Sequence, residues 1–262
     1  MQQPEWSSYE VDVFRGVNAS RGKSHLGPGQ ARCWLGHLNV LHEILVSKWA
    51  TALIMEDDAD WDIAIKEQVA MVEPMIRQIT NSTDDTHGQK SPYGNAWDLL
   101  WLGHCGDLLP LPGSQVLSAI DETLPESPLY REVYGDHSFH PPHLRMVYSS
   151  RSPVCTYAYA VTAEAALRIY QLAAGRRERI ITIDLRNWCR NGTLRCVTVN
   201  PELFHHHKQA GEPSSEIAVV EGWKERASRA PVGYTANIKY SARCNSGSKA
   251  ITACQRDKGE LH

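Results

Sequence analysis

Short apolar runs alternate with segments of helical periodicity along most of this chain, and this alternation constrains the fold more than any single motif does. Residues 51–55 (TALIM), 97–103 (WDLLWLG) and 154–161 (VCTYAYAV) have the length and composition of buried strands. Residues 30–49 repeat apolar side chains at helical spacing, and a second such stripe begins near Asp62. Strands alternating with helices predict an α/β architecture with a mainly parallel sheet flanked by helices.

Later elements follow from local signals. Thr162 is suited to cap a helix over residues 163–174. The segment RIITIDLRNWC reads as an extended stretch that breaks into a short helix at Asp184. Residues 194–204 (LRCVTVNPELF) predict a last strand that leads into three histidines. The six prolines between residues 106 and 143 predict a long irregular excursion.

Bulk composition excludes several classes of protein. A net charge of −3 gives no basic footprint for nucleic acid. No segment approaches the roughly 20 apolar residues that span a bilayer, and the N-terminus shows no signal peptide. The seven cysteines leave disulfide pairing open, although Cys189 with Cys196 and Cys244 with Cys254 are close enough for local disulfides. Together with N-x-S/T triplets, the cysteines favour an oxidising compartment.

A dense acidic cluster, EDDADWD over residues 56–62, directly follows the first apolar run. In α/β sheets ligands gather beyond the carboxyl ends of strands, which places this cluster at a ligand-binding edge. Mn²⁺ and Mg²⁺ accept carboxylate oxygens together with substrate phosphates. Alternate residues of an extended segment share a side, so Glu56 and Asp58 are expected to act together while Asp57 faces away. The open alternative is a charged helix start, with Asp62 as its cap.

Histidines and one further carboxylate extend the set of candidate residues. Imidazole is a good ligand for Mn²⁺, and the run from His205 to His207 offers such ligands, although neighbouring side chains diverge on a strand. A solvated loop is the open alternative for this run. Asp184 is either a helix cap or a catalytic base directed into the cleft. His104 is expected to be a packed or hydrogen-bonded residue at a strand end.

Several stretches, taken together and in order, resemble glycosyltransferase family 25, especially its fungal members. They cover about residues 30 to 210 and are GQARCWLGHLNVLHEIL, ALIMEDDADWD, WDLLWLGHCG, CTYAYAVTAEAA, IDLRNWC and VNPELFHHH. The resemblance implies a GT-A-like single domain over residues 1–210 with a C-terminal polar extension over 211–262. It also implies sugar transfer with inversion from a UDP-sugar, often UDP-galactose, to a glycan or glycoprotein hydroxyl, with Mn²⁺ or Mg²⁺ as cofactor. The implied compartment is the secretory pathway.

The resemblance also implies roles for individual residues. Glu56, Asp57 and Asp58 stand at the family's DxD-like motif, with Asp58 on the metal and Glu56 or Asp57 assisting through the metal or the ribose. Asp184 matches the family's aspartate at the later strand-to-helix break and is the expected base. His205 and His206 fall in the histidine block that we expect to reach the metal.

The chain departs from the family pattern at its start. Members usually begin with a strand and a basic segment that help to form the nucleotide pocket, and this chain begins downstream of them. The family's Asp-Gly segment reads Phe14-Arg15-Gly16 here, so Gly16 is the expected nucleotide contact. Two alternatives stay open: a catalytically inactive homologue that binds a nucleotide sugar or carbohydrate, and a metal-dependent phosphohydrolase, which the ordered blocks disfavour.

Overall fold

A six-stranded sheet forms the centre of the protein, which is described here from a computed structural model. The structure describes residues 26–82, 93–125, 143–174, 180–213, 215, 217, 222, 231–247 and 250–253. The strand order is β1-β6-β3-β7-β5-β4. The strands are β1 (Thr51–Met55), β3 (Leu99–Gly103), β4 (Val116–Ile120), β5 (Leu144–Ser149), β6 (Ala158–Thr162) and β7 (Cys196–Asn200).

The sheet is mixed, and the expectation of a mainly parallel sheet is wrong. Only β3 and β7 pair in parallel, and every other neighbouring pair in this sheet is antiparallel. The cause is the pairing order: β6 lies between β1 and β3, and β5 pairs antiparallel with both β7 and β4. Because β1 and β3 both oppose β6, and β3 is parallel to β7, the strands β1, β3 and β7 share one direction. Their carboxyl ends therefore meet at one edge.

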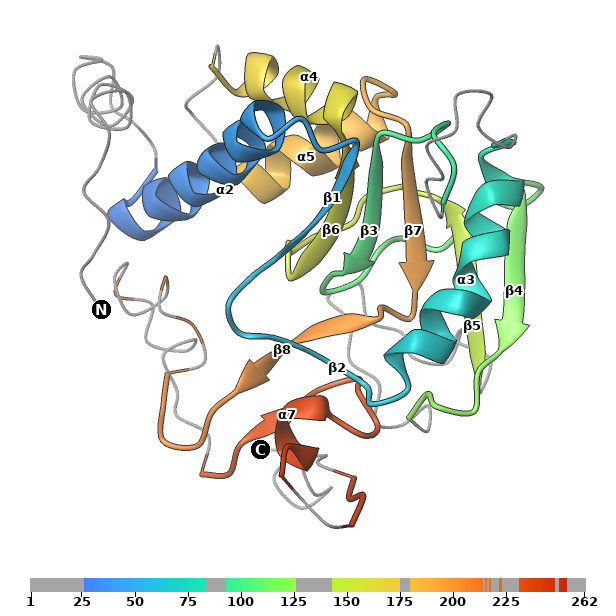
Figure 1. The fold of residues 1–262 in the computed structure, drawn as a ribbon, viewed down its shortest axis with the longest axis vertical. Coiled ribbons are helices and arrows are strands. Elements are labelled where there is room, and N and C mark those ends of the chain that lie inside the picture. The colour runs from blue at the N-terminus through green and yellow to red at the C-terminus, as the bar shows by residue number, and fades with distance from the viewer. Residues whose placement is uncertain are drawn as a thin grey trace.

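Helices cover both faces of this sheet (Figure 1). On one face lie α2 (Pro28–Val46), α4 (Ala163–Ala174) and α5 (Ile181–Arg190), and on the other lies α3 (Ile65–Ile79). The side chains of β3 alternate between the two cores: Leu99 and Trp101 join the first, and Leu100 and Leu102 join the second. No described helix is both long enough and apolar enough to cross a bilayer.

A second, three-stranded sheet lies across the carboxyl edge of the first (Figure 1). It consists of β2 (Ala59–Trp61), β8 (Phe204–Lys208) and β9 (Tyr234–Thr235), in the order β2-β8-β9. The short helix α7 (Ala242–Asn245) packs beside β2. The C-terminal segment 231–247 thus returns to the acidic turn that follows β1.

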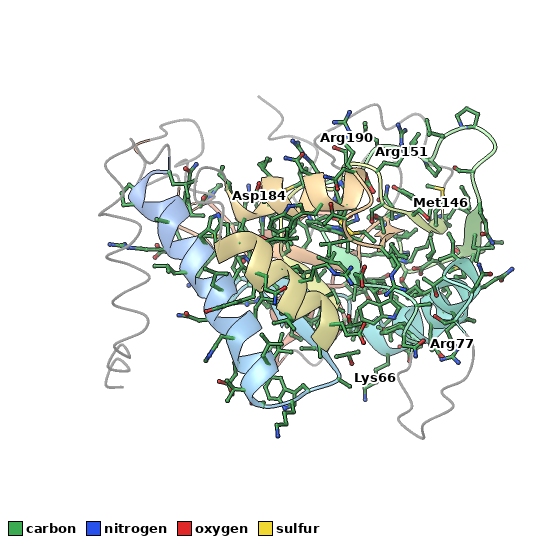
Figure 2. The ribbon with its side chains drawn as sticks, turned by 90° about the horizontal axis from the view of Figure 1, so that it is seen from above. Lys66, Arg77, Met146, Arg151, Asp184 and Arg190 are labelled. Atoms are coloured by element: carbon green, nitrogen blue, oxygen red, sulfur yellow. A yellow bond between two sulfur atoms is a disulfide. The ribbon has the colours of Figure 1, made fainter. Side chains whose placement is uncertain are left out.

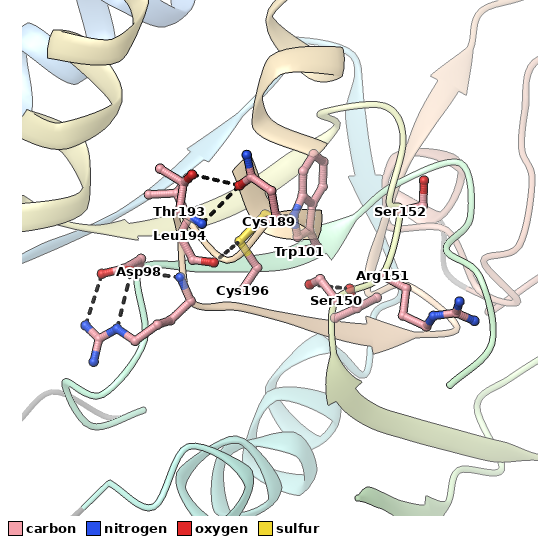
Figure 3. Close-up of a disulfide and its surroundings, with 12 residues drawn as sticks. Asp98, Trp101, Ser150, Arg151, Ser152, Cys189, Thr193, Leu194 and Cys196 are labelled. Atoms are coloured by element: carbon pink, nitrogen blue, oxygen red, sulfur yellow. Dashed lines mark hydrogen bonds and ion pairs between the residues drawn. A yellow bond between two sulfur atoms is a disulfide. The ribbon is translucent and has the colours of Figure 1, made fainter. Parts of the chain in front are cut away.

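Two disulfides are present among the described residues. Cys189–Cys196 joins the end of α5 to β7 and confirms one of the two local pairings expected from the sequence; Figure 3 shows it beside Trp101. Cys105–Cys155, 50 residues apart in sequence, joins the loops that flank the carboxyl edge. The other expected local pair involves Cys254, which lies outside the described residues.

Several element boundaries match the local signals. The helix expected over 163–174 is confirmed as α4, and the Thr162 hydroxyl accepts the Ala165 amide at 3.1 Å as the expected cap. Pro74 lies inside α3, which continues through it. The Asp62 carboxylate accepts the amides of Ala64 and Tyr240, so it closes the turn before α3 rather than occupying the cap position itself.

Other expectations are wrong. The helix around Asp184 begins three residues earlier, at Ile181, because burial of an apolar helical stripe outweighs the strand preference of the β-branched run. The three histidines belong to β8, which decides against the solvated loop that the sequence left open as an alternative. The first apolar run is an edge strand with Leu53 48% and Met55 40% exposed, not one buried on both faces. The excursion 106–143 contains β4, and its residues 126–142 lie outside the described part of the chain.

Candidate metal site

The acidic turn after β1 is held between β6 and β8 at the carboxyl edge of the sheet. The Glu56 amide donates to the Tyr157 carbonyl at 2.9 Å, and the His207 amide donates to the Asp58 carbonyl at 2.8 Å. In the small sheet, Asp60 pairs with His205. The acidic cluster therefore lies next to His205 and His206, because β2 continues the turn and pairs antiparallel with β8.

Asp58 carries the most unusual carboxylate of this turn. Its Oδ1 atom is buried and has no hydrogen-bond partner among the described residues. Burial raises the pKa of Asp58, the Asp57 carboxylate raises it further, and a hydrogen bond from the Asp58 backbone amide and the charge of Arg243 oppose this rise. A buried carboxylate oxygen without a donor is costly unless a ligand supplies the missing interaction.

His205 lies on β8 opposite Asp60, two residues before His207, whose amide binds the Asp58 carbonyl, and its ring is held by Glu202. Its side chain is buried, and Nδ1 lies 2.7 Å from Oε1 of Glu202. A carboxylate accepts but does not donate, so Nδ1 carries a proton, and in the neutral ring Nε2 is the nitrogen that has a lone pair. A histidine oriented through its second nitrogen by a carboxylate is the usual arrangement of a metal ligand.

Asp58 and His205 fit a cation site that a substrate completes. No group of three or more His, Cys, Asp or Glu side chains able to hold a metal occurs within the described ranges. Mg²⁺ and related cations are usually bound by one or two protein ligands together with substrate phosphates and water. The donor set of a carboxylate and an imidazole, with an orphaned carboxylate oxygen, matches that mode of binding.

Glu56 is engaged by a chain of buried polar groups rather than turned towards His205. The Thr156 hydroxyl donates to Glu56 Oε1 at 2.7 Å and lies 3.4 Å from Nε2 of His37. Nδ1 of His37 lies 2.8 Å from the hydroxyl of Tyr159. Burial raises the pKa of Glu56, and the bond from Thr156 opposes that rise. Glu56 therefore lies next to Asp58 but is supported from the α2 side of the sheet.

Neutral His37 makes the protein sensitive to acid. Burial lowers the pKa of His37 to about 4 from 6.5, so between these values the unfolded chain binds the proton more tightly. The stability that depends on neutral His37 is complete above pH 6.5 and is lost as the pH falls towards 4, by about 3 kcal/mol. Denaturant titrations at pH 7 and pH 4 should show a smaller loss for His37→Gln than for the wild type. The exposed His42, on the same helix, supplies the control His42→Gln, which should lose as much stability as the wild type.

Asp60 anchors the C-terminal segment to this turn. Its carboxylate is fully buried and accepts from the amides of Trp61 and Arg243 and from the hydroxyls of Thr235 and Ser241. The Arg243 side chain in turn donates to the carbonyls of Asp57 and Ala59. Segment 231–247 is therefore built into the site through buried, charge-assisted bonds.

Substitution of Asp60 by asparagine should loosen that segment. The amide group places a donor where two donors already point, so about 3 kcal/mol of unfolding free energy should be lost. Hydrogen exchange should increase first at residues 231–247. Asp57→Asn, at the exposed neighbouring carboxylate, is the control for stability. Unchanged exchange in that segment for Asp60→Asn would contradict the anchoring role.

The remaining predicted residues are placed as follows. Asp57 is exposed at the tip of the turn. His206 packs edge-on against Tyr157 with ring centroids 4.6 Å apart, and burial lowers its pKa to about 3. Asp184 is 2% exposed in the first turn of α5, on the side of the molecule where α2 lies (Figure 2). Gly16 lies outside the described residues.

His104 is a structural residue, as expected from the sequence. Its Nδ1 accepts the Gly106 amide at 3.0 Å, and Nε2 lies 3.0 Å from the Val199 carbonyl, to which it donates. Both ring nitrogens are therefore engaged by the backbone.

Three candidate functional residues were not predicted from the sequence: Glu202, Asn237 and Arg243. Glu202 stood inside a predicted strand, and the other two in a tail without periodicity. Asn237 and Arg243 reach the site through contacts between distant segments, which leave no local pattern, and Glu202, although only three residues before His205, is part of no recognised motif.

No protein-family model matches this chain, and a search of curated proteins finds no significant match. The family assignment remains a prediction from the residues and motifs of this sequence.

Proposed function

We propose that this chain is a divalent-metal-dependent glycosyltransferase of the family 25 type. It would transfer a hexose, in the first instance galactose, from a UDP-sugar to a hydroxyl of a glycan or glycoprotein, with inversion at the anomeric carbon. The observation that carries this proposal is the buried Asp58 oxygen, which has no hydrogen-bond partner in the described part of the chain, in a turn paired with the strand of a histidine oriented by a carboxylate. Its position, where the carboxyl ends of β1, β3 and β7 meet, is where nucleotides bind in α/β proteins.

Different residues at this edge of the sheet would bind different parts of the UDP-sugar donor. Asp58 and His205 would hold Mn²⁺ or Mg²⁺, which when bound offsets the negative charge of the diphosphate. Among the described residues, the Arg243 guanidinium binds backbone carbonyls and no carboxylate, so its charge is available to phosphate oxygens. Asp57, exposed at the tip of the turn, is accessible to the nucleoside.

Asp184 is the proposed base for the acceptor hydroxyl. It follows Thr182 by two residues on α5, and the Thr182 hydroxyl lies 3.3 Å from that of Thr156, which binds Glu56. The first turn of α5 therefore abuts the same polar network as the acidic turn. Removal of the hydroxyl proton as the oxygen attacks the anomeric carbon is the chemistry a carboxylate can perform there.

The two disulfides support a secretory location, where oxidised cysteines persist. Cys105–Cys155 lies close to the proposed site: Cys105 accepts a hydrogen bond from the hydroxyl of Tyr157, whose ring packs against His205 and His206. Cys189–Cys196 lies at the amino end of β7, at the opposite edge of the sheet.

Release of UDP from UDP-galactose and UDP-glucose, with Mn²⁺ or with a chelator, tests this function. The proposal expects release with Mn²⁺ and none with the chelator. Binding of UDP without release under any condition would instead favour an inactive nucleotide-sugar-binding protein. Release of phosphate from simple phosphoesters, with no release of UDP from either sugar, would favour a phosphohydrolase.

A further inference from the structure

The turn between β7 and β8 carries a carboxylate that no motif marks. Glu202 is 1% exposed, and its backbone is fixed by Arg145, which donates to the carbonyls of Pro201 and Glu202. Arg145 is itself 1% exposed and pairs with Asp121, Nε to Oδ2 at 2.6 Å. A buried ion pair therefore fixes the position from which the Glu202 side chain extends.

The Glu202 side chain joins the histidine strand to the C-terminal segment. Its Oε1 atom lies 2.7 Å from Nδ1 of His205 and accepts from Nδ2 of Asn237 at 2.8 Å. Asn237 is 3% exposed and adopts a positive φ of 62°, a conformation that asparagine tolerates better than most residues. The backbone at this position thus suits an asparagine, and its amide is directed at Glu202.

We propose that Glu202 is the positioning residue for His205, with Asn237 holding Glu202 in place. This inference rests on the proposed function, in which His205 and Asp58 hold a divalent cation. Glu202 acts in two ways: it fixes the rotation of the imidazole ring, and it keeps the proton on Nδ1. The Nε2 lone pair is then available on the side of the ring away from Glu202. The C-terminal segment is part of the cation site through this second layer of contacts.

A purely structural pair would also hold Glu202 near His205 and would also keep the proton on Nδ1, so Mn²⁺ affinity distinguishes the two roles. A structural hydrogen bond has no effect on Mn²⁺ binding beyond any loss of folding. Positioning for a cation requires that Mn²⁺ bind more weakly to the folded protein when Glu202 is removed. Long-range ¹H–¹⁵N NMR of the metal-free full chain tests the Nδ1–H tautomer that the proposal needs, with His205→Gln identifying the resonances.

The test combines that spectrum with Mn²⁺ titration by electron paramagnetic resonance. The wild type is expected to bind Mn²⁺ and to show the Nδ1–H tautomer. Glu202→Ala is expected to lower Mn²⁺ affinity roughly 10- to 100-fold, which is usual for loss of such a contact, and to mix the tautomers. Glu202→Gln keeps an acceptor oxygen for Nδ1–H and should recover most of the affinity. Glu212→Ala, at an exposed glutamate of the same segment of chain, should bind as the wild type does.

The outcomes separate this inference from the function on which it rests. Wild-type Mn²⁺ affinity in Glu202→Ala, or an Nε2–H tautomer in the wild type, would overturn the positioning role. If Glu202→Ala does not fold, the wild-type tautomer and the affinity of Glu202→Gln still decide it. Mn²⁺ binding that depends on Glu202, without release of UDP from any UDP-sugar, would overturn the transferase and leave the positioning role standing.

Discussion

Replacement of Asp58 by asparagine is expected to lower Mn²⁺-dependent release of UDP by at least about 100-fold. The amide cannot supply the negative charge that a divalent cation requires, and loss of the cation removes several kcal/mol of charge stabilisation from the transition state. A loss of about 2.7 kcal/mol already lowers the rate 100-fold. Initial rates at saturating UDP-sugar and increasing Mn²⁺ measure this loss.

The same substitution should not destabilise the metal-free protein. Burial and the Asp57 carboxylate both raise the pKa of Asp58, so the ionised group is unfavourable in the folded state when no cation is bound. Thermal unfolding of Asp58→Asn without metal should therefore occur at or above the wild-type temperature. Residues kept for function at the expense of stability behave in this way.

A matched control removes a carboxylate elsewhere on the surface. Glu67 is exposed in the first turn of α3, and Glu67→Gln should release UDP at the wild-type rate. If Asp58→Asn unfolds more than about 4 °C below the wild type, which corresponds to roughly 1 kcal/mol, Asp58 has a structural role instead.

Local sequence signals were sufficient for elements whose environment is simple. α4 carries its own cap in Thr162 and was predicted with both boundaries, and β3, buried on every residue, was predicted as a strand, although it starts at Leu99 and not at Trp97. Strand direction could not be predicted, because the insertion of β6 between β1 and β3 is a property of pairing and not of periodicity. The start of α5 was missed because Ile180 to Ile183 favour a strand locally, while burial of Leu185 and Trp188 decides for a helix.

The candidate site could likewise be predicted from the sequence only in part. The acidic turn could be found because its residues are adjacent in sequence and follow an apolar run. The residues that hold this turn and its histidine in place could not be found in the same way. Glu202 and Asn237 are separated by 35 residues, and Asp60 and the Arg243 amide by 183. Such pairs leave no trace in composition or spacing, and only the return of segment 231–247 to β2 and β8 brings them together.

Replacement of Asp184 by asparagine is expected to lower the rate of sugar transfer by roughly 10²- to 10⁴-fold, the usual contribution of a positioned base. Asparagine has nearly the same shape but does not take up a proton from the attacking hydroxyl. Because Asp184 lies on α5 and the proposed cation ligands lie on the acidic turn and β8, affinities for Mn²⁺ and UDP should remain within about twofold of the wild type. Titration calorimetry and rates at saturating donor measure the two effects separately.

The separation of rate from binding is what identifies a base, because Asp184 is also 2% exposed and packed in the first turn of a helix. A structural carboxylate at that position would, on substitution, reduce stability and donor affinity together with the rate. A base would lower the rate alone and would remove the acidic limb of the pH–rate profile, since no carboxylate remains to be protonated. Transfer at the wild-type rate in Asp184→Asn would instead place the base among the other groups of this edge, with Glu56, supported by Thr156, as the next carboxylate to replace.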